Sequence, residues 1–194
     1  MALSQYHQKY SNYSEEEIQK RADEKEAELK SIFEKVSLKT ESEIIKLAVM
    51  GSGDKRFAKH HKRIFEKFVQ KPVEVTTFDI TTEHLEGEER IIQHDCTKTL
   101  PNAPYDITYV HVLLIFIETK KQWDVIENSY DALKRGGIAI HVFDKGDYST
   151  NEKMLADGYF AVPLREYENK LKELNIDYFE VPVKYGLALV LVKS

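Results

Sequence analysis

The fold of this chain is decided by the stretch Leu47-Ala48-Val49-Met50-Gly51-Ser52-Gly53-Asp54. An apolar run ends there in two glycines separated by one residue, and a segment with helical periodicity follows. This order is typical of a buried parallel strand that leads into a tight turn, where glycine lets the backbone lie against a ligand. Two further strand-like runs end in Asp79 and Asp95. The sequence therefore predicts a nucleotide-like ligand at the carboxyl ends of parallel strands.

Length and composition limit the classes of protein that need to be considered. The 194 residues suit a single domain (1–194), in which residues 1–40 are expected to form an N-terminal helical extension. A formal net charge of −5 argues against a nucleic-acid partner. The single cysteine, Cys96, excludes an internal disulfide framework and a zinc ribbon. Because there is no apolar signal core and no run of membrane-spanning length, we expect a cytoplasmic protein without a membrane partner.

Apolar periodicity predicts alternating helices and strands after a long first helix. Ser14 and Glu17 form a capping-box pattern at the start of a helix that should run from Ser14 to Val36. The expected strands are 44–50, 73–79, 90–94, 105–110, 138–143, 178–183 and 187–192, and the expected later helices are 55–69, 121–133 and 165–174. Gly136 and Gly137 are expected to end the helix 121–133 with a left-handed cap.

These elements predict an α/β fold with a doubly wound, mostly parallel seven-stranded sheet. Strands that are apolar on both faces and alternate with helices imply a parallel sheet covered by helices on both faces. The last two strands are joined by Lys184-Tyr185-Gly186, which is too short for a parallel crossover. The final strand is therefore expected to be antiparallel, in a C-terminal hairpin.

Two well-known phosphate-binding turns do not match the Gly51 turn. A dinucleotide fingerprint needs a third glycine where this chain has Arg56, and an acid closer to the turn than Asp79. A P-loop needs Gly-Lys-Ser/Thr after a longer spacer, and the chain has no such sequence.

The order of motifs from Ile44 to Ser194 instead resembles the class I S-adenosylmethionine-dependent methyltransferases. Residues 47–54 resemble the first motif of that family, Tyr105-Asp106-Ile107 the start of its fourth strand, and 133–137 the turn before its fifth strand. The resemblance implies S-adenosylmethionine as the cofactor. It implies a ribose-binding role for Asp79 and an adenine-binding role for Asp95 and Cys96. The remaining cofactor-binding residues that it implies are Gly51, Ser52, Gly53, Ile80 and Val110.

The first motif departs from the family at two positions. Val49 stands where the family usually carries an acid, and Lys55 where it usually carries a third glycine. A lysine side chain that pointed into the site would repel a sulfonium ligand. Asp54 is expected to compensate by pairing with the ligand's ammonium group or with Lys55.

The acceptor for a methyl group should lie above the ends of the fourth and fifth strands. Among the polar residues there, His111 is the best candidate for a general base, because it should lie at the exit of its strand and titrates near neutrality. The others are Tyr109, Glu118, Asp144 and Asp147. His60 and His61 are expected on a solvated helix surface, and no metal site is expected.

Three functions stay open at this point. The first is a methyltransferase acting on a small molecule, as a monomer or as a homodimer. The second is a binding or scaffold protein of the same fold that has lost catalysis, as Val49 and Lys55 would explain. The third is an RNA or protein methyltransferase that uses a basic patch of Lys59, Lys62 and Arg63.

Overall fold

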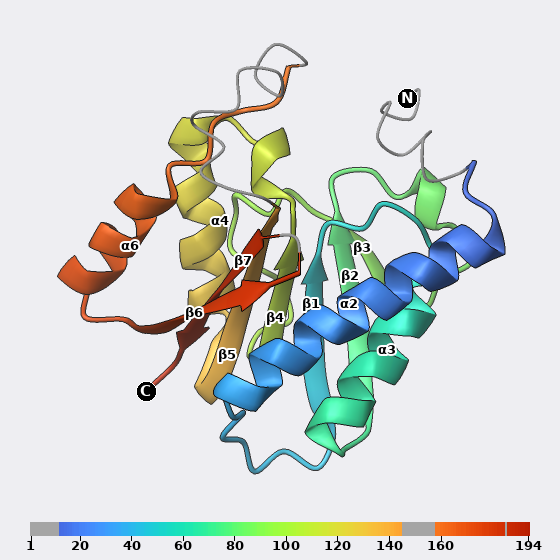
Figure 1. Cartoon of the computed structure of the whole chain (residues 1–194), viewed down its shortest axis with the longest axis horizontal. Helices are drawn as coiled ribbons and strands as arrows, with labels where there is room; N and C mark the ends of the chain where they lie inside the picture. The colour runs from blue at the N-terminus through green and yellow to red at the C-terminus, as the bar shows by residue number, and fades with distance from the viewer. Residues whose placement is uncertain (1–11, 145–157, 185) are drawn as a thin grey trace.

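A computed structural model describes residues 12–144, 158–184 and 186–194 of the chain. Its strands form one seven-stranded sheet in the order β3-β2-β1-β4-β5-β7-β6, with β7 as the antiparallel member (Figure 1). The predicted fold class is confirmed. The strands are β1 (Ile45–Met50), β2 (Val73–Asp79), β3 (Ile91–Gln93), β4 (Tyr105–His111), β5 (Leu133–Asp144), β6 (Asp177–Val183) and β7 (Gly186–Val192). The helices are α2 (Glu15–Lys35), α3 (Arg56–Val69), α4 (Thr119–Asp131) and α6 (Leu164–Glu173), with short 3-10 turns η1 (Glu83–Leu85) and η2 (Leu114–Phe116).

The chain reverses its direction of travel across the sheet between β1 and β4. It starts at β1 in the middle, moves outward through β2 to β3, and then returns to β4 on the other side of β1. In an open α/β sheet such a switch point leaves a crevice at the carboxyl ends of the two central strands. The Gly51 turn follows β1 at this edge, and His111 ends β4 at the same edge.

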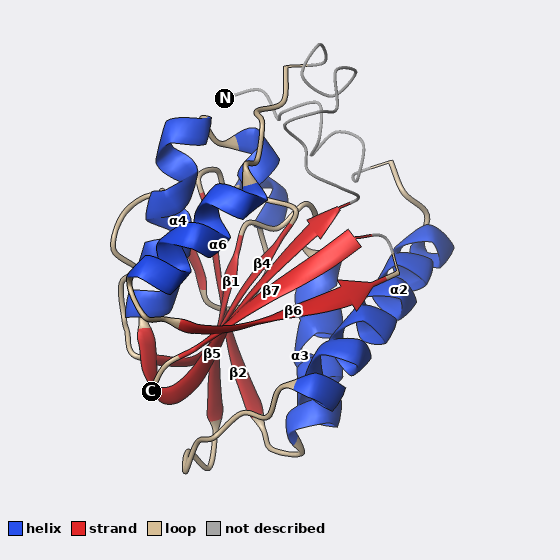
Figure 2. Ribbon diagram, turned by 60° about the vertical axis from the view of Figure 1, so that its left-hand side comes forward, coloured by secondary structure: helices blue, strands red, loops and turns tan. Residues whose placement is uncertain are grey.

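Two layers of helices cover the sheet and enclose two apolar cores. Helices α2 and α3 lie on one face, and α4 and α6 lie on the other (Figure 2). The first core contains Leu29, Ile32, Ile64 and Phe65 from the helices, packed on strand residues such as Val49. The second contains Val125, Ile126 and Leu171 from α4 and α6. Parallel strands that are apolar on both faces need this double covering.

Helix α2 begins as predicted. Ser14 is its N-cap, the Ser14 Oγ accepts a hydrogen bond from the Glu17 amide at 3.2 Å, and the Ser14 amide donates to the Glu17 carboxylate at 2.7 Å. The capping box is therefore present and satisfies two amide groups that would otherwise lack a partner at the helix start.

The expected glycine cap after the helix 121–133 was wrong. Helix α4 ends at Asp131, and β5 already begins at Leu133, so Gly136 lies within a strand. Gly136 has φ +78°, and a Cβ atom there would lie 1.9 Å from the carbonyl oxygen of Lys39. The Lys39 amide donates to the Gly136 carbonyl at 3.1 Å. Glycine is needed at this position because the segment that leads into β1 crosses β5 in backbone contact.

The expected solvated position of His61 was also wrong. His61 is 3% exposed and lies between α3 and β4, with its ring 5.5 Å from the ring of Tyr109. His60 stays partly exposed on the adjacent face of the same helix. The two histidines point in different directions as expected, but one of these directions is the core.

No helix in the described ranges is long and apolar enough to cross a membrane. In the same ranges no group of three or more His, Cys, Asp or Glu side chains could hold a metal ion. The predicted single domain with a helical extension over residues 1–40 remains a prediction, and residues 1–11 of that extension lie outside the described part.

Candidate functional site

The Gly51 turn and Asp79 meet at the switch point of the sheet. Gly51 has φ +81°, a backbone conformation that favours glycine, and its amide donates to the Phe78 carbonyl at 2.7 Å. The next amide, that of Ser52, donates to the Asp79 carboxylate at 3.0 Å. The Thr81 amide donates to the other oxygen of the same carboxylate at 3.1 Å. Asp79 is thus a buried acceptor fixed against the glycine turn.

The end of β3 joins this arrangement through the backbone. The His94 amide donates to the Asp79 carbonyl at 2.8 Å, which brings Asp95 next to the end of β2. The exposed Asp95 carboxylate accepts from the Thr97 hydroxyl at 2.8 Å and from the Thr97 amide at 3.0 Å, and these bonds lower its pKa. An ionised acceptor is therefore held at the position where the resemblance places an adenine amine.

The other predicted cofactor residues differ in what they expose. The side chain of Ile80 is 64% exposed directly after Asp79, so it offers an apolar surface for a planar ring. Cys96 is buried, and burial, assisted by the charges of Asp79 and Asp95, raises the pKa of its thiol to about 12. A thiol in this state is a poor nucleophile. Val110 is 1% exposed in the core between the helices and β4, so only its backbone could reach a ligand.

Two charged residues of the first motif, Lys55 and Asp54, have hydrogen-bond partners outside the glycine turn. The Lys55 ammonium donates to the Glu86 carbonyl at 3.3 Å, in the connection after β2. Asp54 does not pair with Lys55 as expected, because Arg56 is its partner. The Arg56 guanidinium donates to both of its oxygens, at 2.9 and 2.8 Å. Although burial acts to raise the pKa of Asp54, these hydrogen bonds hold it below its usual value.

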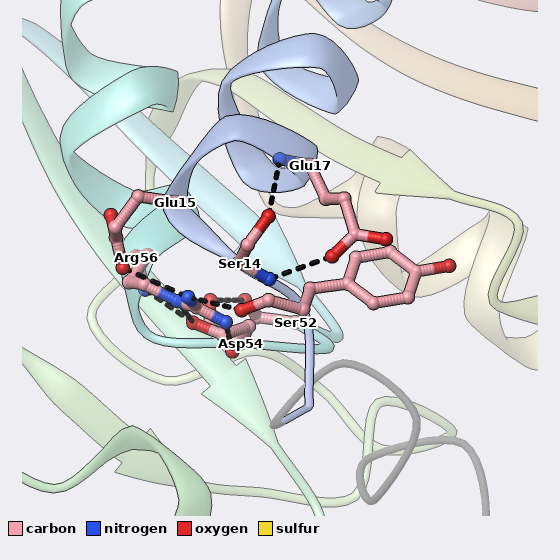
Figure 3. A network of polar contacts seen from close by, with 7 residues as sticks. Ser14, Glu15, Glu17, Ser52, Asp54 and Arg56 are labelled. Carbon is pink, nitrogen blue, oxygen red and sulfur yellow. Dashed lines mark hydrogen bonds and ion pairs between the residues drawn. The ribbon is translucent and has the colours of Figure 1, made fainter.

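Arg56 connects the glycine turn with the start of α2. It donates to Glu15 at 2.9 Å and to the Tyr13 carbonyl at 2.8 Å, while it holds Asp54 on its other side (Figure 3). His84 in η1 also contacts the turn, since its Nε2 lies 2.7 Å from the Ser52 carbonyl oxygen. The turn is therefore held by groups from α2, α3 and η1.

His111, the predicted base, has a buried acidic partner. Its Nε2 lies 3.1 Å from a carboxylate oxygen of Glu28 in α2, while the histidine side chain keeps 26% of its surface exposed. Glu28 itself is 4% exposed. A carboxylate that binds one imidazole nitrogen fixes the tautomer and stabilises the imidazolium form.

Further titratable groups gather behind this pair. The Lys25 ammonium lies 5.5 Å from the centre of the Phe57 ring and 5.8 Å from that of Tyr109, and burial lowers its pKa to about 8. In the described structure, both ring nitrogens of His61 and the hydroxyl of Tyr109 lack a hydrogen-bond partner. Burial lowers the pKa of His61 far below its usual value and raises that of Tyr109.

Sequence reasoning missed Lys25 and Glu28, although the sequence contains a signal. Apolar residues of α2 follow the spacing of one helical stripe, and Lys25 occupies the stripe position between Ala22 and Leu29. A charged residue within such a stripe indicates a buried polar contact. Of the other acceptor-site candidates, Tyr109 is fully buried and Glu118 pairs with Lys120 at 3.0 Å, and Asp147 lies outside the described residues.

Comparisons with known proteins bear on the fold. No family model and no curated protein sequence matches the chain. Among solved structures, an O-methyltransferase family protein from Burkholderia thailandensis aligns with a TM-score of 0.63 at 10% identity, over 91% of this chain and 56% of its own. The O-methyltransferase NcsB1 from neocarzinostatin biosynthesis, in complex with S-adenosylmethionine and 2-hydroxy-5-methyl naphthoic acid, aligns at 0.58 and 12% identity, over 91% and 56% of the two chains.

A third structure is similar over nearly its whole length. The DhpI–SAM–HEP complex aligns with a TM-score of 0.61 at 13% identity, over 96% of this chain and 92% of its own. This chain spans about half the length of the Burkholderia protein and of NcsB1. The chain has the fold of the class I methyltransferases, as the sequence motifs predicted.

Proposed function

We propose that this chain is an S-adenosylmethionine-dependent methyltransferase that acts on a small molecule. The observation that carries the proposal is the meeting of the Gly51 turn, Asp79 and Asp95 at the switch point of a class I methyltransferase fold. Structures of the same fold contain S-adenosylmethionine, and one of them also contains a small hydroxylated aromatic acid. A small acceptor is also in keeping with the net charge of −5.

The residues present fit the adenosine part of this cofactor. The Asp79 carboxylate is buried, but each of its oxygens has a lone pair left after its one backbone hydrogen bond, so the pair can accept from a ribose diol. Ile80 offers an exposed apolar surface to adenine, and Asp95 an acceptor to its amine. S-adenosylmethionine, when bound, supplies an electrophilic methyl group.

The chain's own chemistry in this proposal is the removal of a proton from the acceptor. His111 accepts the proton from the acceptor's hydroxyl or amine, and the Glu28 carboxylate at 3.1 Å stabilises the resulting imidazolium. Methyl transfer otherwise depends on positioning of the two reactants in line. The acceptor is expected above β4, on the exposed side of the His111 ring.

Calorimetric titration of the full chain with S-adenosylmethionine and S-adenosylhomocysteine tests the proposal. We expect dissociation constants in the micromolar range, equivalent to about −8 kcal/mol. Asp79→Ala should abolish binding, whereas Asp131→Ala removes an acid that is 67% exposed on α4 and should leave affinity unchanged. Unchanged affinity in Asp79→Ala would contradict the assigned site.

The alternative of a catalytically inactive binding or scaffold protein rests on Val49 and Lys55. It predicts no heat of binding from a folded chain at millimolar ligand. The alternative of an RNA or protein methyltransferase is weakened because Arg63, one of its three basic residues, pairs with Glu26 at 2.9 Å. It predicts RNA binding that weakens steeply with salt.

A further inference from the structure

A leucine side chain lies directly on the backbone of the Gly51 turn. A Cβ atom built on Gly51 would be 2.9 Å from Leu113 Cδ1, 3.5 Å from Cδ2 and 3.6 Å from Cγ. Leu113 belongs to the short segment between β4 and η2. A Gly-x-Gly turn lets the backbone approach the methionine portion of S-adenosylmethionine. At Gly51 the Leu113 side chain lies against that backbone.

The backbone holds Leu113 in this place. Val112 has φ +55°, a strained conformation for a β-branched residue, which persists only where its surroundings enforce it. The Val112 amide donates to the Val142 carbonyl of β5 at 2.9 Å, and the Leu113 carbonyl accepts from the Phe116 amide at 3.0 Å. The segment is thus bonded on both sides of the Leu113 side chain, which directs that side chain onto the turn.

The adenosine end of the same site does not depend on this segment. Asp79 is held by Ser52 and Thr81, and Asp95 by Thr97. The Ile80 side chain is 64% exposed. Among the described residues, the adenosine end of the site therefore has its acceptors in place and an exposed apolar side chain, and the Leu113 side chain lies on the turn at the other end.

We infer that Leu113 determines which adenosine compounds this site accepts, by covering the part of the Gly51 turn that an amino-acid arm must reach. Compounds with a short 5′ substituent fit without displacement of Leu113. Compounds with a methionine or homocysteine arm bind only when the leucine moves aside, and their apparent affinity falls by the fraction of molecules in that state. This inference rests on the proposed function, since it concerns the same site.

The test compares two probes on the full chain by calorimetric titration. One probe is S-adenosylhomocysteine, and the other is 5′-deoxy-5′-methylthioadenosine, which shares the adenosine and the sulfur but lacks the amino-acid arm. If the open state is populated at about a tenth, Leu113→Ala should tighten binding of S-adenosylhomocysteine about tenfold. It should change binding of methylthioadenosine by no more than about twofold, the range of a substitution that makes no contact with the ligand.

Leu174→Ala is the matched control, because Leu174 is an exposed leucine at the C-terminal end of α6 and does not belong to the Gly51 turn or to the segment between β4 and η2. It should change neither affinity. Equal or weaker binding of S-adenosylhomocysteine by Leu113→Ala, while the unaltered chain binds it, would overturn the inference and leave the proposed function standing. Failure of both folded proteins to bind either probe would overturn the proposed function, and the inference with it.

A second measurement checks the contact without any ligand. Gly51→Ala should lower the melting temperature more in the unaltered chain than in Leu113→Ala, because only the former places a methyl group against Leu113. The backbone strain of alanine at φ +81° is common to both backgrounds and cancels in the comparison. An equal loss in the two backgrounds would show that Leu113 does not lie on the turn.

Discussion

A buried carboxylate lies near each end of strand β4, one from the strand itself and one from helix α2, and the two differ in their hydrogen-bond partners. Near the start, Asp106 is 0% exposed and accepts from the hydroxyls of Thr40 and Ser42 at 2.6 Å, from the Lys46 amide at 2.8 Å and from Lys134 at 3.1 Å. Although burial acts to raise the pKa of Asp106, these hydrogen bonds hold it below its usual value.

At the other end, Glu28 is almost as deeply buried but meets a titratable partner. In the described structure its carboxylate has one hydrogen bond, to His111, with the Lys25 ammonium nearby. A carboxylate whose acceptor sites are filled by fixed donors has a structural role. A carboxylate that is hydrogen-bonded to a histidine at the edge of the site can take part in proton transfer through that histidine. We therefore expect the carboxylate at the start of β4 to contribute to stability, and we propose that the one at its end takes part in the reaction.

The largest effect is expected from Asp106→Ala. It leaves the Lys134 ammonium, two hydroxyls and the Lys46 amide without their acceptor, which should reduce the free energy of unfolding by about 3–5 kcal/mol. Urea denaturation followed by circular dichroism measures this loss. A loss below about 1 kcal/mol, the usual value of a single hydrogen bond, would remove the distinction between the two carboxylates.

Glu28→Gln should act on the reaction more than on stability. We expect kcat to fall about 100-fold, because the imidazolium formed on His111 loses the carboxylate that stabilises it. For the same reason the acidic limb of the pH–rate profile should move to lower pH. Glu34→Gln removes a charge from the same helix at a position that is 62% exposed, and it should leave both unchanged. An unaltered pH profile in Glu28→Gln would show that the His111 pair has only a structural role.

Acidification should separate the two ends of β4. Because burial, with the nearby charges of Lys25, His111 and His60, holds the pKa of His61 far below 6.5, the folded state binds fewer protons than the unfolded state as pH falls. Stability is thus lost below pH 6.5, by up to about 1.4 kcal/mol for each pH unit. Asp106 acts in a lower pH range, since its contribution is lost only as pH falls from the usual 3.8 through the lower pKa of the folded state.

The variant His61→Phe measures the histidine contribution. Between pH 6.5 and 5 the unaltered chain should lose up to about 2 kcal/mol more than the variant, in parallel denaturation series. His141, whose pKa burial lowers to about 3, remains in both proteins and contributes equally. Hydrogen exchange should show that amides of α2 and α3 lose protection before those at the start of β4. The reverse order would contradict the comparison.

The smallest effect is expected from Ser42→Ala. It removes one of four donors to Asp106 and should reduce the free energy of unfolding by about 1 kcal/mol, with kcat unchanged. A loss of activity without a loss of stability would show that the start of β4 communicates with the site.

Local sequence patterns predicted most of the fold, because it depends on local periodicity. The run from Val73 to Asp79 and the capping box at Ser14 lie where the sequence placed them. The misplaced start of β5 has a non-local cause. Gly136 resembles a helix cap in sequence, but its conformation is required by the approach of Lys39, almost 100 residues earlier in the chain.

Of the candidate site, the sequence could predict the positions of Asp79, Asp95 and His111 at strand ends, because strand ends follow from periodicity. It could not predict the contact of His111 with Glu28, which are 83 residues apart. That contact depends on how α2 is rotated on the sheet. The burial of His61 and the position of Leu113 on Gly51 depend on tertiary packing in the same way.

The two ends of α2 are attached by interactions of different physical kinds. Its N-terminal end and its middle are held partly by ion pairs that reach the surface, those of Glu15 with Arg56 and of Glu26 with Arg63. Just beyond its C-terminal end, the chain is held by the backbone contact of Lys39 with Gly136. Screening shortens the range of charge interactions from about 8 Å at physiological ionic strength to about 3 Å at 1 M, and it leaves backbone hydrogen bonds unaffected. Rising ionic strength should therefore weaken the attachment of α2 at its N-terminal end and leave the attachment beyond its C-terminal end unchanged. Amide exchange measured along the helix at increasing salt would then be faster toward the N-terminus.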